Sequence, residues 1–255
     1  MNQVLSLIDN FLVLLFILWC VGLIFFYLVS DGIREKFTLR SIQAFNHFRR
    51  EVDLAVEAGK RLHISLGRGN IHDLQGGSAF IGLTILDRCA RDASNSDRPP
   101  VTTSGDGLIT ILSQDTLQST YRSLATEQRY DPTNARLTGL TPMAYAAGTM
   151  PAIHDEHVSA NIFAGHFGAE IALLTEAGER SRSLTVAGSD SLPAQAVLYA
   201  TTDEPLLGEE LYAAGAYLGA GAAHTASLGM QDILRWLLAV IIVIGAIFKL
   251  LGILS

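Results

Sequence analysis

Glycine and charged residues recur wherever a short apolar run of this sequence gives way to a polar loop. The candidate ligand-binding residues in these loops are Gly67, Arg68, Gly69, Asp106, His166, Glu170, Asp190 and Asp203. Glycine lets a backbone approach a ligand closely, while guanidinium, imidazole and carboxylate groups bind polar ligands. If the apolar runs are parallel strands, their carboxyl ends are where such a sheet binds ligands. We therefore predict a ligand site there, although strand-to-helix turns also use glycine and capping Asp for structural reasons alone.

The loop around Arg68 lacks the signatures of the common nucleotide-binding loops. Gly67 and Gly69 form a Gly-x-Gly pair, but the third glycine of the dinucleotide fingerprint and the lysine of a P-loop are absent. Arg68 alone could pair with a phosphate. His166 lies within Gly165-His166-Phe167-Gly168. It could act as a general acid or base, or it could be a turn histidine bonded to the backbone.

The sequence assigns no catalytic residue, no cofactor and no metal. His154-Asp155-Glu156-His157 places two histidines on one helix face. Zinc needs three or four ligands, and the spacing indicates no third, so we interpret this segment as a polar helix end. A Gly-x-Ser-x-Gly elbow is absent, and neither Cys20 nor Cys89 lies in a reactive motif.

Strands and helices that would position these loops alternate through the middle of the chain. The expected strands are 62–66, 101–103, 136–140, 158–164 and 183–187, and a sixth is expected at 196–201. The expected helices are 78–93, 112–127, 169–177 and 209–218, and Pro142 suits the first turn of another. Such alternation predicts the α/β class, with a mainly parallel, doubly wound Rossmann-like sheet.

Both ends of the chain are apolar enough to cross a membrane. Residues 11–29 carry no charge and would reach about 28 Å as a helix, close to a hydrocarbon core of roughly 30 Å. A cleaved signal peptide is the alternative, but no Lys or Arg precedes the run and no A-x-A site follows it. A second span is expected at 232–255, where Lys249 can extend toward the interface.

Two spans would enclose the soluble part of the chain. We expect a short extracytoplasmic tail at 1–10, a juxtamembrane amphipathic helix at 30–58 and an α/β domain at 59–231. The apolar positions of the amphipathic helix are Phe37, Leu39, Ile42, Phe45, Phe48 and Val52. This helix is expected either to lie on the membrane or against another copy, or to be the first helix of the soluble core.

Basic residues follow the first span and none precedes it. They are Arg34, Lys36, Arg40, Arg49 and Arg50. The positive-inside rule then places the domain in the cytoplasm and both termini outside. The formal net charge of −7 argues against nucleic acid as a partner. The expected partners are the lipid bilayer, further copies of this chain and an unidentified small molecule.

Several motifs resemble an uncharacterised bacterial family of membrane-anchored proteins, known only as a domain of unknown function. They are SLGRG at 65–69, AYAAG at 144–148, GHFGAE at 165–170, YATTD at 199–203, and GEE at 208–210 through LG at 218–219. The resemblance implies a Rossmann-like α/β domain between two transmembrane helices, in the inner membrane of a bacterium. It implies no activity and no catalytic residues.

The function predicted from these patterns is that of a non-enzymatic, membrane-anchored scaffold or interaction protein that self-assembles. Gly215, Gly219 and Gly221 lie in a run of small residues at 215–223, and such a run lets helices approach closely. Packing of the last helix on its own sheet explains the same pattern. The alternative function is a membrane-tethered nucleotide- or small-ligand-binding enzyme or sensor that uses the loops at the carboxyl ends of the strands.

Overall fold

The computed structural model describes residues 2–29, 39–71, 76–96 and 98–250 of the chain. It separates into two compact units. One comprises Met1–Arg40 and Gly221–Ser255, and the other is Ser41–Ala220. The second unit therefore contains every residue of the predicted ligand site.

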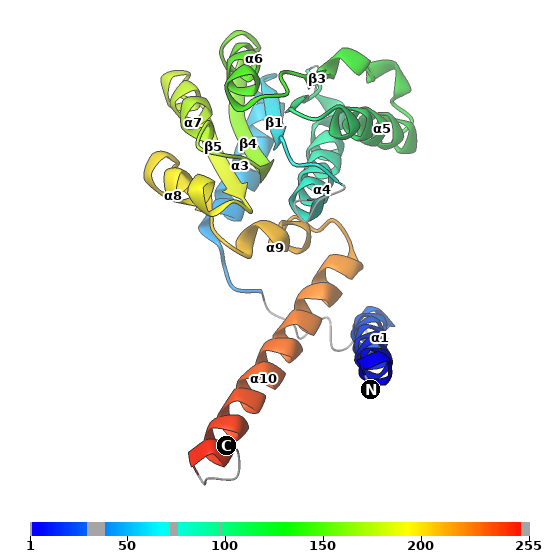
Figure 1. The fold of residues 1–255 in the computed structure, drawn as a ribbon. Helices are drawn as coiled ribbons and strands as arrows, with labels where there is room; N and C mark the ends of the chain where they lie inside the picture. Colours follow the sequence, from blue (N-terminus) through cyan, green and yellow to red (C-terminus); the bar gives the residue numbers. More distant parts are fainter. Residues whose placement is uncertain (1, 30–38, 72–75, 97, 251–255) are drawn as a thin grey trace. The chain divides into compact units, whose positions relative to one another are not determined.

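A six-stranded parallel sheet forms the centre of the Ser41–Ala220 unit (Figure 1). Its strands are β1 (Arg61–Gly67), β2 (Val101–Ser104), β3 (Ala135–Leu137), β4 (Val158–His166), β5 (Leu184–Ser189) and β6 (Glu204–Leu206). The strand order is β3-β2-β1-β4-β5-β6, so the order reverses between β1 and β4. This is the doubly wound arrangement, and it confirms the predicted α/β class with a parallel sheet.

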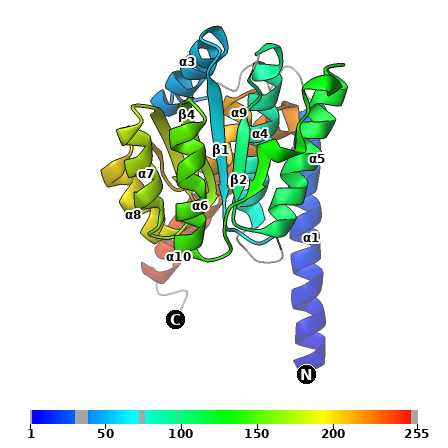
Figure 2. The same cartoon turned by 90° about the horizontal axis from the view of Figure 1, so that it is seen from above.

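Helices cover both faces of the sheet and form two separate apolar cores. The helices of the first core are α3 (Gln43–Glu57), α4 (Gly76–Asp92), α5 (Gly107–Ser123) and α9 (Glu210–Tyr217). Those of the second core are α6 (Pro142–Asp155), α7 (Ile171–Arg180) and α8 (Leu192–Thr201). Figure 2 shows α6 and α7 in front of the strands and α9 behind them. We call the two sides of the sheet the α4 face and the α6 face.

The amphipathic helix expected at 30–58 begins, within the described residues, at Gln43 and belongs to the soluble core. Phe45, Phe48 and Val52 are buried in the core of the α4 face. The ring of Phe45 stacks on that of Tyr217 in α9, with centroids 4.8 Å apart. Of the two alternatives for this helix, the structure therefore shows the first helix of the core.

The strand expected at 196–201 is wrong, because these residues form the second half of α8. Pro193 lies in the first turn of this helix, where its missing amide hydrogen costs nothing. Ala194 and Leu198, four residues apart, are its buried positions. A short apolar run is compatible with either a strand or a buried helix, and here helical spacing decides. The sixth strand follows at Glu204–Leu206.

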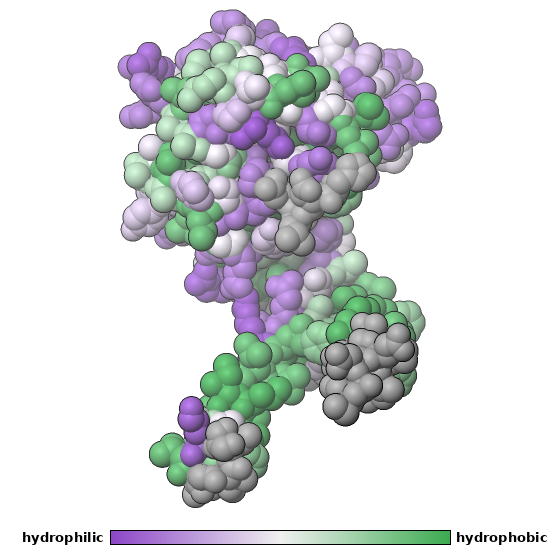
Figure 3. Space-filling view, viewed as in Figure 1, coloured by the Kyte–Doolittle hydropathy of each residue, from purple (hydrophilic) through white to green (hydrophobic). Residues whose placement is uncertain are grey.

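The other unit contains α1 (Asn2–Val29) and α10 (Ala222–Leu250). Among the described residues, α10 is the one helix long and apolar enough to cross a membrane, and the shorter apolar helix Val13–Phe26 lies within α1. Figure 3 shows a largely hydrophobic surface along α10. Arg34, Lys36 and Phe37, together with 251–255 of the expected second span, lie outside the described residues.

The run of small residues at 215–223 does not form one continuous helix, because α9 ends at Tyr217 and α10 begins at Ala222. Gly219 adopts a φ of +69° and Gly221 a φ of +141°, so the chain leaves the helical conformation between α9 and α10. The amide of Ala220 donates to the carbonyl oxygen of Gly215 (2.8 Å), which is the long-range bond of a Schellman motif. Gly215 itself is buried. The glycine at 219 thus serves to end a helix.

Candidate functional site

The carboxyl ends of β1 and β4 meet where the strand order reverses, with Gly67 paired to His166. A Cβ atom on Gly67 would lie 2.3 Å from the carbonyl oxygen of His166, and one on Gly165 would lie 2.1 Å from that of Leu66. Neither position can carry a side chain without moving the backbone. The amide of Arg68 donates to the carbonyl oxygen of His166 (2.8 Å). These contacts place Arg68 and His166 together at the switch point of the sheet.

A carboxylate on β5's following loop holds the ring of His166. The Nδ1 atom lies 2.7 Å from Oδ1 of Asp190, and Oδ2 of Asp190 accepts a hydrogen bond from the Ser78 hydroxyl (3.0 Å). Because a carboxylate accepts, Nδ1 carries the proton, and Nε2 is the ring nitrogen that remains for a ligand. No described residue bonds to this Nε2 atom. The ring therefore has the tautomer and orientation of a histidine in an Asp–His pair.

Two residues of this cluster carried no assignment from the sequence. Ser78 lies in the first turn of α4, directly after the loop that follows β1. Tyr212 lies at the start of α9, and its ring is 3.4 Å from the position of a Cβ on Gly77. Burial raises the pKa of the Tyr212 phenol, and the nearby Asp190 carboxylate raises it further. Each residue lies in the first turn of a helix that follows a strand-end loop. This position in the sequence is the feature that could have indicated their place in the cluster.

Arg68 forms an ion pair with Glu170. The Nε atom of Arg68 lies 2.9 Å from Oε1 of Glu170, which also accepts from the amide of Gly168 (3.0 Å). The Glu170 side chain is 3% exposed. Burial by itself would raise the pKa of this carboxyl, but the Gly168 amide and the Arg68 guanidinium outweigh it and lower the pKa below its ordinary value. Glu170 is therefore an ionised, buried partner that fixes the direction of Arg68.

Gly105, which follows β2, has no side chain and so leaves room for the side chain of Arg68. A Cβ at this position would lie 2.4 Å from Cγ of Arg68, so a larger residue would displace the arginine. The two terminal nitrogens of the guanidinium have no hydrogen bond to any described residue. Glu170 thus fixes the guanidinium of Arg68 through Nε, and the two terminal nitrogens remain as a planar pair of hydrogen-bond donors.

Asp106 and Gly69, which were also predicted to bind a ligand, have structural roles or are buried in this region. Asp106 is the N-cap of α5, and its Oδ1 atom accepts from the amides of Leu108 (2.9 Å) and Ile109 (3.0 Å). Its capping is the reason that α5 begins at Gly107, ahead of the residue expected from the apolar pattern. Gly69 is buried in the loop after Arg68. The carboxylate of Asp106 is committed to the helix end.

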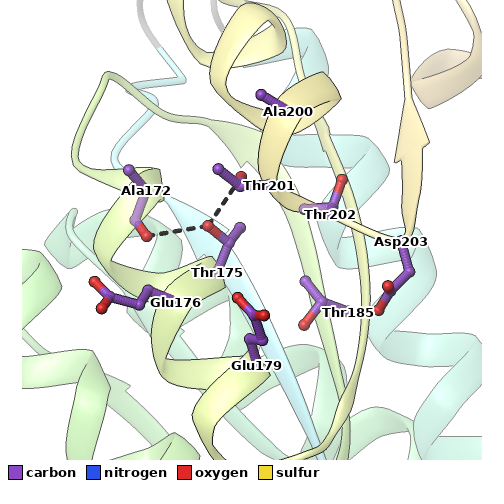
Figure 4. A pocket seen from close by; sticks show the side chains of 9 residues that line it. All are labelled: Ala172, Thr175, Glu176, Glu179, Thr185, Ala200, Thr201, Thr202 and Asp203. Atoms are coloured by element: carbon purple, nitrogen blue, oxygen red, sulfur yellow. Dashed lines mark hydrogen bonds between the residues drawn. The ribbon is translucent and has the colours of Figure 1, made fainter.

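Asp203 lies at the opposite end of the sheet, so its assignment to the strand-end loops is wrong. The residue precedes β6, and in a parallel strand this is the amino end. The error follows from the strand expected at 196–201. With that strand, the loop containing Asp203 would follow a strand, whereas in the structure it connects the end of α8 to the start of β6. Asp203 lines a cavity of about 530 Å³ beside α7 and α8 (Figure 4).

Among the described residues, the two histidines at the end of α6 neither bond to the strand-end cluster nor line that cavity. The Nδ1 atom of His154 is 2.8 Å from the Ser181 hydroxyl oxygen. His157 has a φ of +55° and follows the helix end. Within the described ranges, no three His, Cys, Asp or Glu residues gather in a way that could hold a metal ion. That these histidines bind no metal stays a prediction.

Comparisons with known proteins add one relationship. A model of a protein family described as a domain of unknown function matches residues 2–255. Curated proteins and solved structures give no match. The family description names no reaction, ligand or partner.

Proposed function

We propose a function for this chain from the geometry of its strand ends, because it belongs to the family DUF6754, whose description states no function. The Ser41–Ala220 unit is a membrane-anchored module that binds a small phosphate-bearing ligand at the carboxyl ends of β1 and β4. The observation that carries the proposal is the pair Arg68 and His166 at the switch point. Each is held by its own carboxylate, and each has ring or guanidinium nitrogens that bond to no described residue.

A phosphate group suits these two side chains. The guanidinium presents a rigid fork of donors that matches phosphate oxygens, and it keeps its charge at any physiological pH. His166 adds a donor when its Nε2 is protonated, and the ring is already oriented by Asp190. Loops at the switch point of a doubly wound sheet are also where such folds bind nucleotides. The absent fingerprint and P-loop motifs mean that side chains, and not a glycine-rich loop, would recognise the phosphate.

Calorimetric titration of the full chain in detergent tests this proposal, with ATP, NAD and inorganic phosphate as separate probes. At least one probe should bind the wild type, and Arg68→Lys should weaken its Kd about tenfold because a lysine lacks the fork. Arg91→Lys is the matched control, since Arg91 also forms an ion pair through Nε, with Asp87 at 3.0 Å. No binding of any probe at millimolar concentration, or equal effects of both variants, would overturn the proposal.

The proposed membrane arrangement adds α1 as a second span, with the α/β unit in the cytoplasm of a bacterium and both termini outside. It rests on the uncharged segment 11–29 and on the basic residues that follow it. In intact cells, a membrane-impermeant thiol reagent should label Asn2→Cys, while added protease should leave the α/β unit uncut. Digestion of the unit from outside would reverse the orientation.

Self-assembly is a second candidate function, and the edge of the sheet favours it. Strand β3 is a terminal strand, and large apolar side chains are exposed on it or just after it: Leu137 (49%), Leu140 (69%) and Met143 (66%). Such an edge can pair with another copy. The small residues at 215–223 no longer support a helix interface, because Gly219 ends α9.

Light scattering of the detergent-extracted particle tests self-assembly. A homo-oligomer is expected, and Leu140→Asp should reduce its mass. Leu192→Asp is the control, because Leu192 is equally exposed (77%) but lies on α8, away from this edge strand. A monomeric wild type would refute self-assembly, and an unchanged Leu140→Asp particle would exclude this edge.

A further inference from the structure

The imidazole of His166 is held by a carboxylate and yet keeps one nitrogen open to a ligand. Its Nδ1 atom lies 2.7 Å from Oδ1 of Asp190, while Nε2 bonds to no described residue and is not buried. The side chain is 22% exposed, so a small molecule can reach the ring. His63, by contrast, is fully buried and has both ring nitrogens bonded to protein. His166 is therefore accessible for chemistry, whereas His63 is not.

Asp190 gives this ring the arrangement that makes an imidazole a nucleophile. The Oδ2 atom of Asp190 accepts from the Ser78 hydroxyl (3.0 Å), so both oxygens of the carboxylate are fixed. With the proton on Nδ1, a neutral ring carries a lone pair on Nε2. Histidine side chains can form covalent intermediates through such a lone pair. The carboxylate of Asp190 would stabilise the positive charge that the ring acquires when Nε2 forms a bond.

The guanidinium of Arg68 lies beside the loop that follows His166. Gly67 and His166 are paired at the ends of β1 and β4. The Nε atom of Arg68 and the amide of Gly168 both bond to Oε1 of Glu170, at 2.9 and 3.0 Å. The two terminal nitrogens of Arg68 bond to no described residue and are not buried. They can thus neutralise the oxygens of a phosphoryl group that reaches His166.

We infer that Nε2 of His166 accepts a phosphoryl group from a phosphoanhydride, such as an acyl phosphate or a nucleoside triphosphate. The step takes place in the proposed phosphate site and therefore depends on the proposed function. The Nε2 lone pair forms a bond to phosphorus, while the bond from phosphorus to the bridging oxygen breaks and leaves its electron pair on that oxygen. The carboxylate or nucleoside diphosphate departs as an anion. The proton on Nδ1 remains between the ring and Asp190, whose negative charge balances that of the phosphorylated ring.

The groups around His166 favour a phosphoanhydride over a phosphate ester. An ester would release an alkoxide, which needs a proton from the site. Glu170 is ionised and paired with Arg68, so it has no proton to give. Burial raises the pKa of the Tyr212 phenol, and Asp190 raises it further, which makes the phenol a poorer acid. A phosphoanhydride releases a stable anion and needs neither group.

Incubation of the full chain in detergent with radiolabelled acetyl phosphate, and separately with ATP labelled in its γ-phosphate, tests the inference. After a rapid quench in alkali, at least one probe should leave label on the wild type that acid removes, as expected for a bond from phosphorus to nitrogen. Mass spectrometry of the peptides should place the label on His166, and phosphorus NMR should place it on Nε2. Label on another residue, or on Nδ1, would overturn the inference.

Calorimetry with the same two probes separates this step from the proposed function. A probe that binds but leaves no label on His166 would overturn the covalent step and leave the phosphate site standing. If neither probe nor inorganic phosphate binds and no label appears, both are overturned. Label from acetyl phosphate alone would identify the donor as an acyl phosphate, and label from ATP alone would identify it as a nucleoside triphosphate.

Substitutions test the roles of the ring and of its carboxylate. His166→Gln should abolish the label, and Asp190→Asn should slow labelling about tenfold without weakening the Kd of the probe, because the charge that stabilises the phosphorylated ring is lost. His47→Gln is the matched control. The Nδ1 atom of His47 also faces a carboxylate, that of Glu204, but at the amino end of β6. This variant should label like the wild type, and a loss as large as in His166→Gln would overturn the inference.

Discussion

The two faces of the central sheet are stabilised by different chemistry, although the same strands form both. On β1, Leu62, Ile64 and Leu66 point to the α4 face and are buried among apolar side chains. His63 and Ser65, between them, are equally buried but belong to a polar layer on the α6 face. A parallel strand that is buried on both faces usually consists of apolar residues throughout. The polar residues of β1 depart from this pattern.

The polar layer connects neighbouring strands. His63 lies 3.0 Å from Oδ1 of Asn161 on β4 and 2.9 Å from the hydroxyl oxygen of Thr103 on β2. Asn161 in turn donates to Ser183, just before β5 (2.6 Å). Each bond forms in only one register, whereas apolar contacts tolerate small slips. The comparison teaches that apolar burial stabilises both faces, and that the α6 face adds a polar layer, which specifies the alignment of the strands.

Removal of volume from the α4 face should give the largest effect. Ile64 is completely buried, and Ile64→Ala should lower the free energy of unfolding by about 3 kcal/mol through lost burial and an unfilled cavity. Urea denaturation followed by circular dichroism measures this loss. Ser65→Ala, the adjacent position on the α6 face, is the reference and should cost about 1 kcal/mol. Equal losses would remove the proposed difference between the faces.

Acid should weaken the α6 face selectively. Burial lowers the pKa of His63 from 6.5 to about 4, although the bond with Asn161 opposes this. As the pH falls below 6.5, the unfolded chain binds a proton that the folded chain does not, so stability is complete above pH 6.5 and is lost toward pH 4. The loss should be about 2 kcal/mol between pH 6.5 and 5.

The variant His63→Gln isolates that contribution. It cannot titrate, so its stability should fall less than that of the wild type over the same pH range. Urea denaturation at several pH values gives the difference between the two slopes, and other titrating groups cancel in it. If the wild type and His63→Gln lost stability equally as the pH falls, protonation of His63 would not destabilise the fold and the prediction would be wrong.

A single hydrogen bond on the α6 face should have a smaller effect. Tyr145 is fully buried on α6, and its hydroxyl bonds to the Ser65 hydroxyl. Tyr145→Phe keeps the ring and should cost about 1 kcal/mol. The double variant with Ser65→Ala should cost less than the sum of the two single changes, because both remove the same bond. Strict additivity in the urea midpoints would contradict this coupling.

Helix ends on the two faces should give the smallest effects, with opposite signs. On the α4 face, α9 ends with Gly219 at a φ of +69°, and on the α6 face, α7 is followed by Arg182 at +52°. Gly219→Ala should destabilise by about 1 kcal/mol, and Arg182→Gly should stabilise by a similar amount, because only glycine adopts this conformation without strain. Melting temperatures that shift in the same direction would refute this account.

The class of fold could be predicted from the sequence because strands and helices of different period alternate along it. Five of six strands follow from short apolar runs between turn residues. Residues 196–201 were misassigned because a run of this length has no clear period, and Asp203 was misplaced with them. Arg68, His166, Glu170 and Asp190 were predicted together because parallel strands bring their carboxyl ends to one edge. The pairing of His166 with Asp190, and the cavity beside α7 and α8, depend on side-chain directions that spacing does not contain.

The contact between Phe45 and Tyr217 constrains how the unit can be made in a cell. Arg49, on the same helix as Phe45, also bonds to the carbonyl oxygen of Tyr217, which lies 168 residues later in the chain. At ordinary rates of synthesis, roughly ten to thirty seconds separate the appearance of the two partners. During that interval the apolar side of α3 has no α9 to cover it. Closure of the α/β unit therefore comes last, when α9 has been made and α10 is following it out of the ribosome.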